Sequence, residues 1–391
     1  MPFRLIREFI KLESAAGTIL FLTAVLAILV DNTPFAAGYE AFFKTIISFS
    51  IGQFQLSKPL LLWVNDGFMS IFFLLVGLEI KREMMEGELN SISKATLPAI
   101  AAFGGMLFPA IIYAAINWHH PVAIQGWAIP TATDTAFSLA ILTLLGSRIP
   151  VGLKIFLTAL AIFDDIGAII VMAIFYSSHI SAYMLLCALG LIVVLLLMNY
   201  LDVQRPAAYF IVGIILWMCL LKSGIHATLA GIILAFTIPM KSPESTKSLL
   251  RTLEHRLHPW VAFGVLPLFA FANAGVSLTG FGWEQLATSI PVGIAAGLFL
   301  GKQLGIWGVS MLAVRLRIAR LPQGVTGFGL YGLSLAAGVG FTMSLFIGTL
   351  AFHSVMPYAT FVRVGVIAGS LISGFLGYWI LRWAYPTSSV T

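Results

Sequence analysis

Residues 156–175 read FLTALAIFDDIGAIIVMAIF, an apolar run with two adjacent carboxylates, Asp164 and Asp165, near its middle. The run is long enough to cross a membrane as a helix. A charged side chain at the centre of such a helix costs roughly 2.5–3.5 kcal/mol on insertion scales, and neighbouring like charges repel each other. The pair therefore predicts an ion or proton site inside a membrane, where the acids face water, a cation or a counter-charge.

The composition also indicates a membrane protein. Of the 391 residues, 59% are hydrophobic and only 10% are charged, and the mean hydropathy is +0.98, whereas soluble domains carry about 25% charged residues. The net charge of +6 does not predict nucleic-acid binding, because basic residues do not cluster with aromatic ones on a soluble segment. Cys187 and Cys219 lie in apolar runs without metal-like spacing, which predicts membrane-core thiols.

Twelve stretches are apolar and long enough to predict membrane-spanning helices. They lie near 12–31, 59–80, 96–117, 122–145, 151–176, 182–201, 206–221, 224–240, 259–277, 291–314, 328–352 and 358–384. With both termini in the cytoplasm, seventeen loop Lys and Arg residues lie inside and four outside, a strong positive-inside bias. We therefore expect an all-α polytopic membrane protein in the lipid bilayer, with cytoplasmic termini.

A short segment between the first two spans has the pattern of a β-hairpin. Residues 48–56 alternate polar and apolar side chains around Gly52 and Gln53, which predicts a hairpin at approximately 45–58 on the outer surface. An isolated hairpin is only marginally stable. It therefore either pairs with a second protomer or lies as an ordered loop on its own protein.

Four ionisable residues lie deep in predicted spans: Asp134, Asp164, Asp165 and Lys302. Left unpaired, they would cost roughly 10–14 kcal/mol on the insertion scale. A structural ion pair accounts for Lys302 and one acid but not for three acids, so a negative surplus remains for a cation or protons. Consecutive residues lie about 100° apart around a helix. One acid of the pair therefore faces a cavity, and the other faces the helix that carries Lys302.

Two spans carry interruptions at mid-membrane. Pro130 removes a backbone donor before a Thr-rich run that ends at Asp134 and offers helix-capping groups, and Gly338 and Gly340 precede the cap-competent Thr342. A simple proline kink and loose glycine packing are the plainer interpretations. Paired interruptions in two halves of a transporter mark its binding site. Glycines at every fourth position would bring the helix of Lys302 close to its neighbours; they are Gly293, Gly297, Gly301 and Gly305.

A second group of charged residues lies at predicted cytoplasmic helix ends, as GLEIKRE at 77–83 and EHRLH at 254–258. Histidine titrates between pH 5 and 8, so these segments form either a pH-responsive cluster or ordinary solvated helix ends. His226 is a lone histidine at a membrane edge, with a structural role as the default. An enzyme is not expected, because the chain lacks HExxH, a Walker loop and the GxGD motif of intramembrane aspartyl proteases, and no cofactor is expected.

Several motifs together resemble the NhaA family of bacterial Na⁺/H⁺ antiporters over essentially the whole chain. They are GLEIKRE at 77–83, IPTATDT at 129–135, AIFDDIG at 161–167, GIHATLAG at 224–231, LEHRLHPW at 253–260 and LGK at 300–302. This family is itself among the examples from which the rule on interrupted spans was drawn. The resemblance implies a twelve-helix inner-membrane protein of inverted repeats, with two discontinuous crossing helices and a homodimer joined by the hairpin.

The function implied by the resemblance is electrogenic, pH-regulated antiport by alternating access. Na⁺ or Li⁺ would leave the cell in exchange for more than one proton, without ATP. A proton-coupled solute symporter and a passive cation channel are the alternatives. The chain would be one transporter domain, 1–391, whose parts are core helices at approximately 96–176 and 291–384, interface helices at approximately 12–86 and 182–277, and the hairpin at approximately 45–58.

The resemblance also implies roles for individual residues. Asp164 and Asp165 would bind the cation and the protons. Asp134 and Thr133 would lie where the broken helices cross, with Asp134 offsetting exposed helix N-termini. Lys302 would either offset exposed C-termini or pair with Asp164, and Thr342 would lie at the second break. The pH-sensing region would comprise Glu79, Arg82, Glu83, His226, Glu254, His255 and His258.

Overall fold

The computed structural model describes residues 2–51, 54–177, 181–240, 248–277, 282–352 and 358–386, apart from the side chains of residues 2–14, 51, 54, 88 and 283. Each of the twelve predicted spans contains helix within these residues. In the described chain, seven uninterrupted helices are long and apolar enough to cross a membrane, and two bent pairs pass the same test with bends of 110° and 48°. The polytopic α-helical fold is therefore confirmed.

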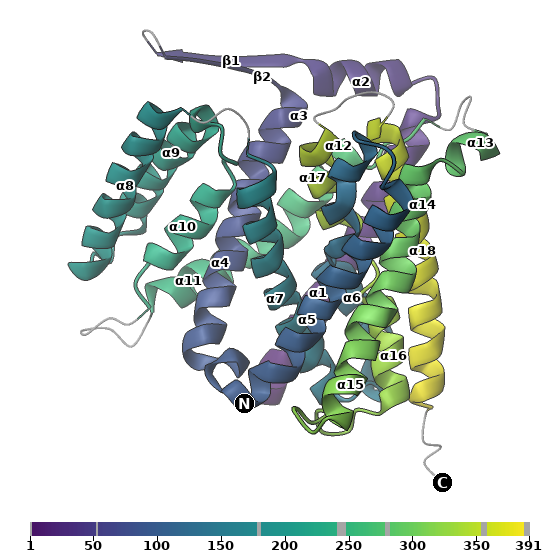
Figure 1. Cartoon of the computed structure of the whole chain (residues 1–391). Coiled ribbons are helices and arrows are strands. Elements are labelled where there is room, and N and C mark those ends of the chain that lie inside the picture. Colours follow the sequence, from purple (N-terminus) through teal and green to yellow (C-terminus); the bar gives the residue numbers. More distant parts are fainter. Residues whose placement is uncertain are drawn as a thin grey trace. The chain divides into compact units, whose positions relative to one another are not determined.

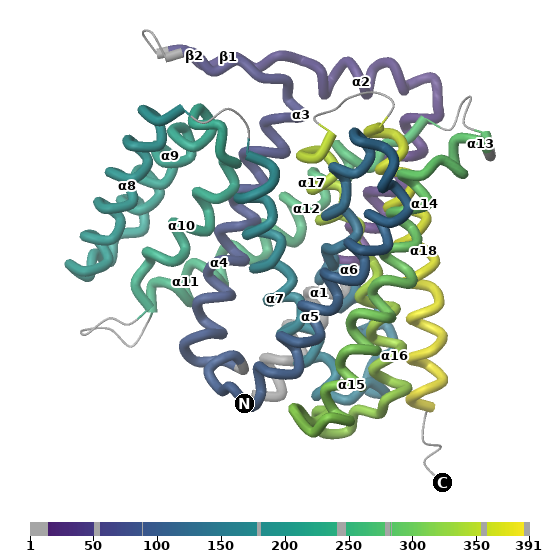
Figure 2. The backbone as a smooth tube through the Cα atoms, in the orientation of Figure 1, coloured from purple at the N-terminus to yellow at the C-terminus, as the bar shows by residue number. Residues whose placement is uncertain are grey.

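The chain divides into two compact units, which are described separately below and in Figures 1 and 2. Unit 1 comprises Met1–Asn32, Ser91–Ala168 and Asn273–Thr391, and unit 2 comprises Thr33–Asn90 and Ile169–Ala272. The sequence grouped residues 12–86 together, whereas the structure divides this range and assigns its first helix to unit 1. The naming of core and interface helices stays a prediction.

Unit 1 is built around α5, which runs without interruption past Pro98 and Pro109. Its buried core joins α5 to α6, α7 and α16 through residues such as Leu97, Leu157 and Leu330, and α16 lies beside α18 in Figure 2. The elements are α1 (Pro2–Asp31), α5 (Ile92–Asn117), η3 (Ala123–Thr131), α6 (Thr135–Leu144), η4 (Gly146–Arg148), α7 (Val151–Phe175, up to Ala168), α13 (Trp283–Leu286), α14 (Ser289–Ala296), η6 (Gly297–Gly301), η7 (Gln303–Gly308), α15 (Val309–Arg315), α16 (Gly327–Ala336), α17 (Phe341–Phe352) and α18 (Tyr358–Ala384).

Unit 2 packs α4 against α10, and α8 against α9 (Figure 1). Helix α9 begins with Pro206 and ends at Ser223, and Gly224 caps it with a φ of 85°, the left-handed conformation that glycine adopts readily. Only the nine-residue α10 follows in the predicted span 224–240. The elements are α2 (Ala36–Lys44), β1 (Ile46–Ile51), β2 (Phe54–Pro59), α3 (Leu60–Trp63), η1 (Val64–Phe68), α4 (Met69–Glu86), η2 (Glu88–Asn90), α8 (Ala182–Tyr200), α9 (Pro206–Ser223), α10 (Leu229–Thr237), α11 (Leu249–Trp260), η5 (Val261–Val265) and α12 (Leu266–Asn273).

The predicted hairpin is present in unit 2. Strands β1 and β2 pair antiparallel, with Ile46 opposite Pro59 and Ser48 opposite Ser57. The predicted turn at Gly52 and Gln53 lies outside the described residues. Figure 1 shows the two strands as a ribbon that continues from α2 and leads into α3. Side chains such as Ile46 and Phe49 are exposed, so the hairpin keeps unburied apolar surface.

Candidate functional site

The first interrupted span consists of η3, an extended link and α6. Pro130 lies in the last turn of η3, and the backbone becomes extended at Ala132. Asp134 is the N-cap of α6, and its carboxylate accepts a hydrogen bond from the backbone N–H of Phe137 at 3.1 Å. The interruption predicted from Pro130 and the following polar run is therefore a true break and not a kink.

The second interrupted span consists of α16 and α17, which are bent by 48° relative to each other. The link contains Gly338 and Gly340. A Cβ atom on Gly338 would lie 2.6 Å from the carbonyl oxygen of Leu298, and one on Gly340 would lie 3.1 Å from that of Ala132. Gly338 is therefore required for close approach of the link to neighbouring backbone, and the surroundings of Gly340 are also tight, so the two glycines do not mark loose packing.

The two breaks meet at Asp134. Its backbone N–H donates to the carbonyl of Val339 at 2.7 Å, and its Oδ2 accepts from the backbone N–H of Thr342 at 3.0 Å and from the hydroxyl of Thr342 at 2.5 Å. Because Oδ1 already caps α6, one carboxylate serves the N-termini of α6 and α17 together. Helix N-termini carry partial positive charge. Asp134 therefore places negative charge at two such ends.

Thr342 lies at the second break, as expected, but it does not cap the helix. Helix α17 begins at Phe341, so Thr342 lies in its first turn. The capping group comes instead from Asp134, 208 residues away in sequence. Sequence patterns detect capping residues next to a helix, but they do not detect a cap supplied by another broken span.

Two serines bind backbone carbonyl groups near the C-terminal ends of α16 and η3, the first halves of the two broken spans. The hydroxyl of Ser138 in α6 donates to the carbonyl of Ala336 at 2.9 Å, and that of Ser344 in α17 donates to the carbonyl of Ile129 at 2.7 Å. Both serines are fully buried. Each broken span thus donates to the first half of the other. The sequence analysis did not identify this reciprocal pair, although both serines lie four residues beyond a break.

Lys302 is fully buried and lies beside the first break. Its Nζ donates to the carbonyl of Thr131 at 2.6 Å, to the hydroxyl of Thr133 at 2.8 Å and to Oδ2 of Asp164 at 3.0 Å. The hydroxyl of Thr133 in turn donates to the same Oδ2 at 2.6 Å. The two alternatives for Lys302 therefore hold together, because it both binds the last carbonyl of η3 and pairs with Asp164.

The glycines at every fourth position, from Gly293 to Gly305, explain how Lys302 reaches this position. A Cβ on Gly297 would lie 2.7 Å from Cβ of Pro130, and one on Gly301 would lie 2.6 Å from Cα of Pro109. Only glycine permits backbone contacts this close. Lys302 is also flanked by two π-helical segments, η6 and η7, which the sequence did not predict and which occur frequently at functional sites.

Asp164 and Asp165 differ in environment, as their angular separation predicted. Asp164 is 2% exposed, and its Oδ1 has no hydrogen-bond partner among the described residues. Asp165 is partly exposed and close enough to Lys302 to interact with it electrostatically. Carboxylate oxygens are suitable ligands for hard cations. The buried Oδ1 of Asp164 and the adjacent Asp165 therefore offer acceptors for a cation or a proton.

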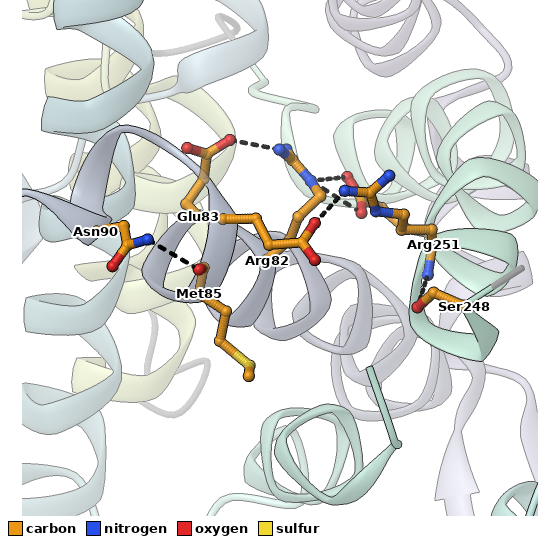
Figure 3. A network of polar contacts seen from close by, with 8 residues as sticks. Arg82, Glu83, Met85, Asn90, Ser248 and Arg251 are labelled. Atoms are coloured by element: carbon orange, nitrogen blue, oxygen red, sulfur yellow. Dashed lines mark hydrogen bonds and ion pairs between the residues drawn. The ribbon is translucent and has the colours of Figure 1, made fainter. Parts of the chain in front are cut away.

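The second predicted group lies in unit 2, at the end of α4 (Figure 3). Nε of Arg82 donates to both carboxylate oxygens of Glu254, at 2.9 and 3.0 Å, and an Nη atom of Arg82 donates to Glu83 at 2.6 Å. Glu79 interacts electrostatically with Arg82 and Glu254. Arg251 and Glu86 extend the network through an ion pair that the sequence analysis did not identify. The structure thus brings both segments of this prediction together.

Burial shifts the pKa values of two groups in this cluster, Glu254 and His258. Burial raises the pKa of Glu254, and the positive charge of Arg82 acts in the opposite direction. Burial lowers the pKa of His258, and the nearby His255 lowers it further. His255 itself is exposed. The cluster therefore contains a carboxyl group that holds its proton to higher pH and an imidazole that accepts one only at lower pH.

His226 does not join this cluster. It precedes α10, where its carbonyl accepts from the backbone N–H of Leu229. Lys81, next to the cluster, contacts the opposite end of α10 by donating to the carbonyls of Phe236 at 2.8 Å and Ile238 at 2.6 Å. The length of α10 thus separates His226 from the charged residues. The positive charge of Lys81 at a helix C-terminus is favourable and was not predicted.

The sequence of this chain is similar to those of known proteins. A family model described as Na⁺/H⁺ antiporter 1 matches residues 7–381. The Na⁺/H⁺ antiporter NhaA of Rhodospirillum rubrum is 54% identical over 390 residues, covering 98% of each chain. The Na⁺/H⁺ antiporter NhaA 1 of Syntrophotalea carbinolica is 52% identical over 383 residues, covering 98% of this chain and 97% of that protein.

Proposed function

The chain belongs to the Na⁺/H⁺ antiporter 1 family, and we propose that it exchanges Na⁺ or Li⁺ for protons across the membrane that it spans. It is a secondary active transporter, in which protons moving down their gradient drive the cation outward. More than one proton enters for each cation, so the exchange moves net charge. The protein lies in the bacterial inner membrane with both termini in the cytoplasm, in agreement with the distribution of Lys and Arg.

The contact among Lys302, Thr133 and Asp164 carries this proposal. In the described structure the charge of Asp164 is balanced by Lys302 at 3.0 Å, while Oδ1 of Asp164 remains open. Na⁺ binds between this oxygen and Asp165 when both acids are deprotonated. Protons and Na⁺ therefore compete for the same oxygens, and each carboxylate that loses its proton contributes to the exchange ratio.

The broken helices supply a fixed electrostatic frame for that competition. Asp134 offsets the positive N-termini of α6 and α17, and Lys302 offsets the carbonyl end of η3. Because these charges are already in place before a cation arrives, the frame needs little rearrangement when the load changes. We infer an alternating-access mechanism. A conformational change exposes the site at the crossing of the broken spans, with either Na⁺ or protons bound, first to one side of the membrane and then to the other.

The cluster of Arg82, Glu254 and His258 regulates transport by pH. Competition alone slows antiport in acid, because protons then occupy the carboxylates. Protonation of His258 in acid adds positive charge next to the ion pair of Arg82 and Glu254, and this sharpens the response. The hairpin of β1 and β2 joins two protomers through its exposed apolar side chains, which would otherwise face water.

Proteoliposomes with a pH-sensitive dye inside test the proposal. Addition of Na⁺ or Li⁺ to the wild type should move protons in the opposite direction, faster when valinomycin lets K⁺ cross the membrane and dissipate the accumulated charge. Asp164→Asn and Asp165→Asn should abolish this signal, whereas Glu284→Gln, which removes an exposed carboxylate, should leave it unchanged. Na⁺ entry without proton movement would instead identify a channel, and a dependence on added sugars or organic anions would identify a symporter.

A further inference from the structure

Unit 1 contains an apolar cavity of about 290 Å³ beside the second break. Its walls are side chains of α1, α6 and α18, and its floor includes Val339 and Phe341, which flank the last residue of the link before α17. Ala24 completes the floor from α1. These three floor residues are buried, with exposed fractions of 5% for Ala24, 3% for Val339 and 6% for Phe341.

The mouth of the cavity opens on the apolar surface of two helices. Phe21 and Val25 on α1 are 43% and 36% exposed, and Leu371 and Phe375 on α18 are 54% and 64% exposed. Helix α18 is long and apolar enough to span the membrane, and α1 passes the same test as part of a bent pair. The mouth is therefore continuous with the surface that the protein presents to the hydrocarbon of the bilayer.

Water is a poor occupant of this cavity. A buried water molecule needs two to four polar partners, and cavities lined by apolar groups stay dry. Ser370 is the one polar side chain among the lining residues, and its hydroxyl already accepts a hydrogen bond from the backbone N–H of Gly340 at 3.2 Å. An empty cavity would forfeit dispersion contacts along its whole lining, and hydrocarbon from the adjoining bilayer can supply them.

We propose that this cavity is a binding site for one acyl chain of a bilayer phospholipid. The chain enters between α1 and α18 and rests on Val339 and Phe341. Val339 accepts the hydrogen bond of Asp134, and Phe341 directly precedes Thr342, which binds the carboxylate of Asp134. The bound chain therefore packs against the link that holds the two broken spans together. The proposal rests on the cavity and on its opening at the membrane-facing surface, and it holds whichever ion the protein transports.

Photo-crosslinking of the full chain in vesicles tests the site. The vesicles contain phosphatidylethanolamine and phosphatidylglycerol with a small fraction of phosphatidylcholine that carries a diazirine on one acyl chain, and adducts are located by mass spectrometry of peptides. Lipids that merely surround the protein can label exposed residues such as Leu22 and Leu29, but they cannot reach the buried floor. We expect adducts on Ala24, Val339 or Phe341 in the wild type.

Filling the cavity should remove these adducts selectively. Ala24→Phe should lower labelling of Val339 and Phe341 at least tenfold while labelling of Leu29 persists, and Leu22→Phe, on the exposed face of the same helix, should leave floor labelling unchanged. Gly374→Val provides a second filling variant, because a Cβ there already lies 3.2 Å from Val339. Absence of floor adducts in the wild type, undiminished floor adducts in a folded filling variant, or equal loss in Leu22→Phe would overturn the proposal.

Discussion

The buried pair of Lys302 and Asp164 should be strongly coupled in a double-mutant cycle of Lys302→Met and Asp164→Asn. Both side chains are almost fully buried, at 0% and 2% exposure. Removing one partner of a buried ion pair leaves the other charge uncompensated and costs about 3–5 kcal/mol of unfolding free energy. Lys302→Met should therefore be destabilised by this amount, and Asp164→Asn by somewhat less, because Asp165 still interacts electrostatically with Lys302.

The double variant should be destabilised by less than the sum of the two single effects. With both charges removed, the uncompensated charge disappears, so the coupling free energy should be about 2–3 kcal/mol. The double variant should nevertheless remain less stable than the wild type. The carbonyl of Thr131 loses the donor that now lies at 2.6 Å, and a buried unsatisfied acceptor costs about 1–3 kcal/mol.

The assay is unfolding of the purified protein in mixed detergent micelles, followed by circular dichroism at fixed pH. Lys44 and Glu40 provide a matched control cycle, because they form an ion pair whose side chains are 76% and 55% exposed. Exposed pairs of this kind couple by less than about 1 kcal/mol. Additive effects of Lys302→Met and Asp164→Asn, or a coupling no larger than that of the control pair, would refute the reasoning from burial.

Further predictions concern the crossing, the pH cluster and the hairpin. Asp134→Asn should destabilise the protein by about 2–4 kcal/mol in the same assay, since two helix N-termini lose an anionic acceptor, whereas Thr342→Val should cost about 1 kcal/mol; equal effects would contradict the double cap. Because the native pKa of His258 is lowered from 6.5, its contribution to stability should be present above pH 6.5 and fall as the pH drops towards the native pKa; His258→Gln should remove this dependence in pH-resolved melting. Glu254 has the opposite sign, because its native pKa is raised from 4.5: stability should fall as the pH rises above 4.5, and Glu254→Gln should abolish that decline. Replacing residues 46–59 by a glycine–serine linker should yield monomers in analytical ultracentrifugation, and a persistent dimer would exclude the hairpin as the joint.

Much of the fold could be predicted because membrane helices leave direct traces in sequence. Pro130 and the glycines of the second link are residues that a continuous helix does not favour, so both breaks were detectable. Lys302 could be predicted as a counter-charge because no other basic residue lies as deep in a predicted span; Lys154, Arg363 and Arg382 lie near span ends. Whether Lys302 pairs with Asp164, binds a helix end or does both could not be predicted, because this depends on the close approach of helices that are distant in sequence.

The remaining features depend on three-dimensional neighbours. Ser138 and Ser344 bind carbonyls of the opposite span, whereas Ser334 binds the carbonyl of Tyr331 within its own helix at 2.7 Å. In the sequence, both kinds of serine lie in an apolar run, so the sequence does not predict which carbonyl each one binds. The motif groups His226 with the pH-sensing residues, but it lies at one end of α10 whereas Lys81, next to those residues, contacts the other end.

In the proposed function, Na⁺ and protons compete for Asp164 and Asp165, and the most direct test is the Na⁺ affinity of the purified protein as a function of pH. Isothermal titration calorimetry between pH 6 and 9 provides this measurement. Binding that displaces one proton weakens about tenfold for each unit of acidification below the site's pKa, and more steeply if two protons leave. We predict this slope for the wild type and no measurable Na⁺ binding to Asp164→Asn. A Na⁺ affinity independent of pH, or retained in Asp164→Asn, would contradict the account.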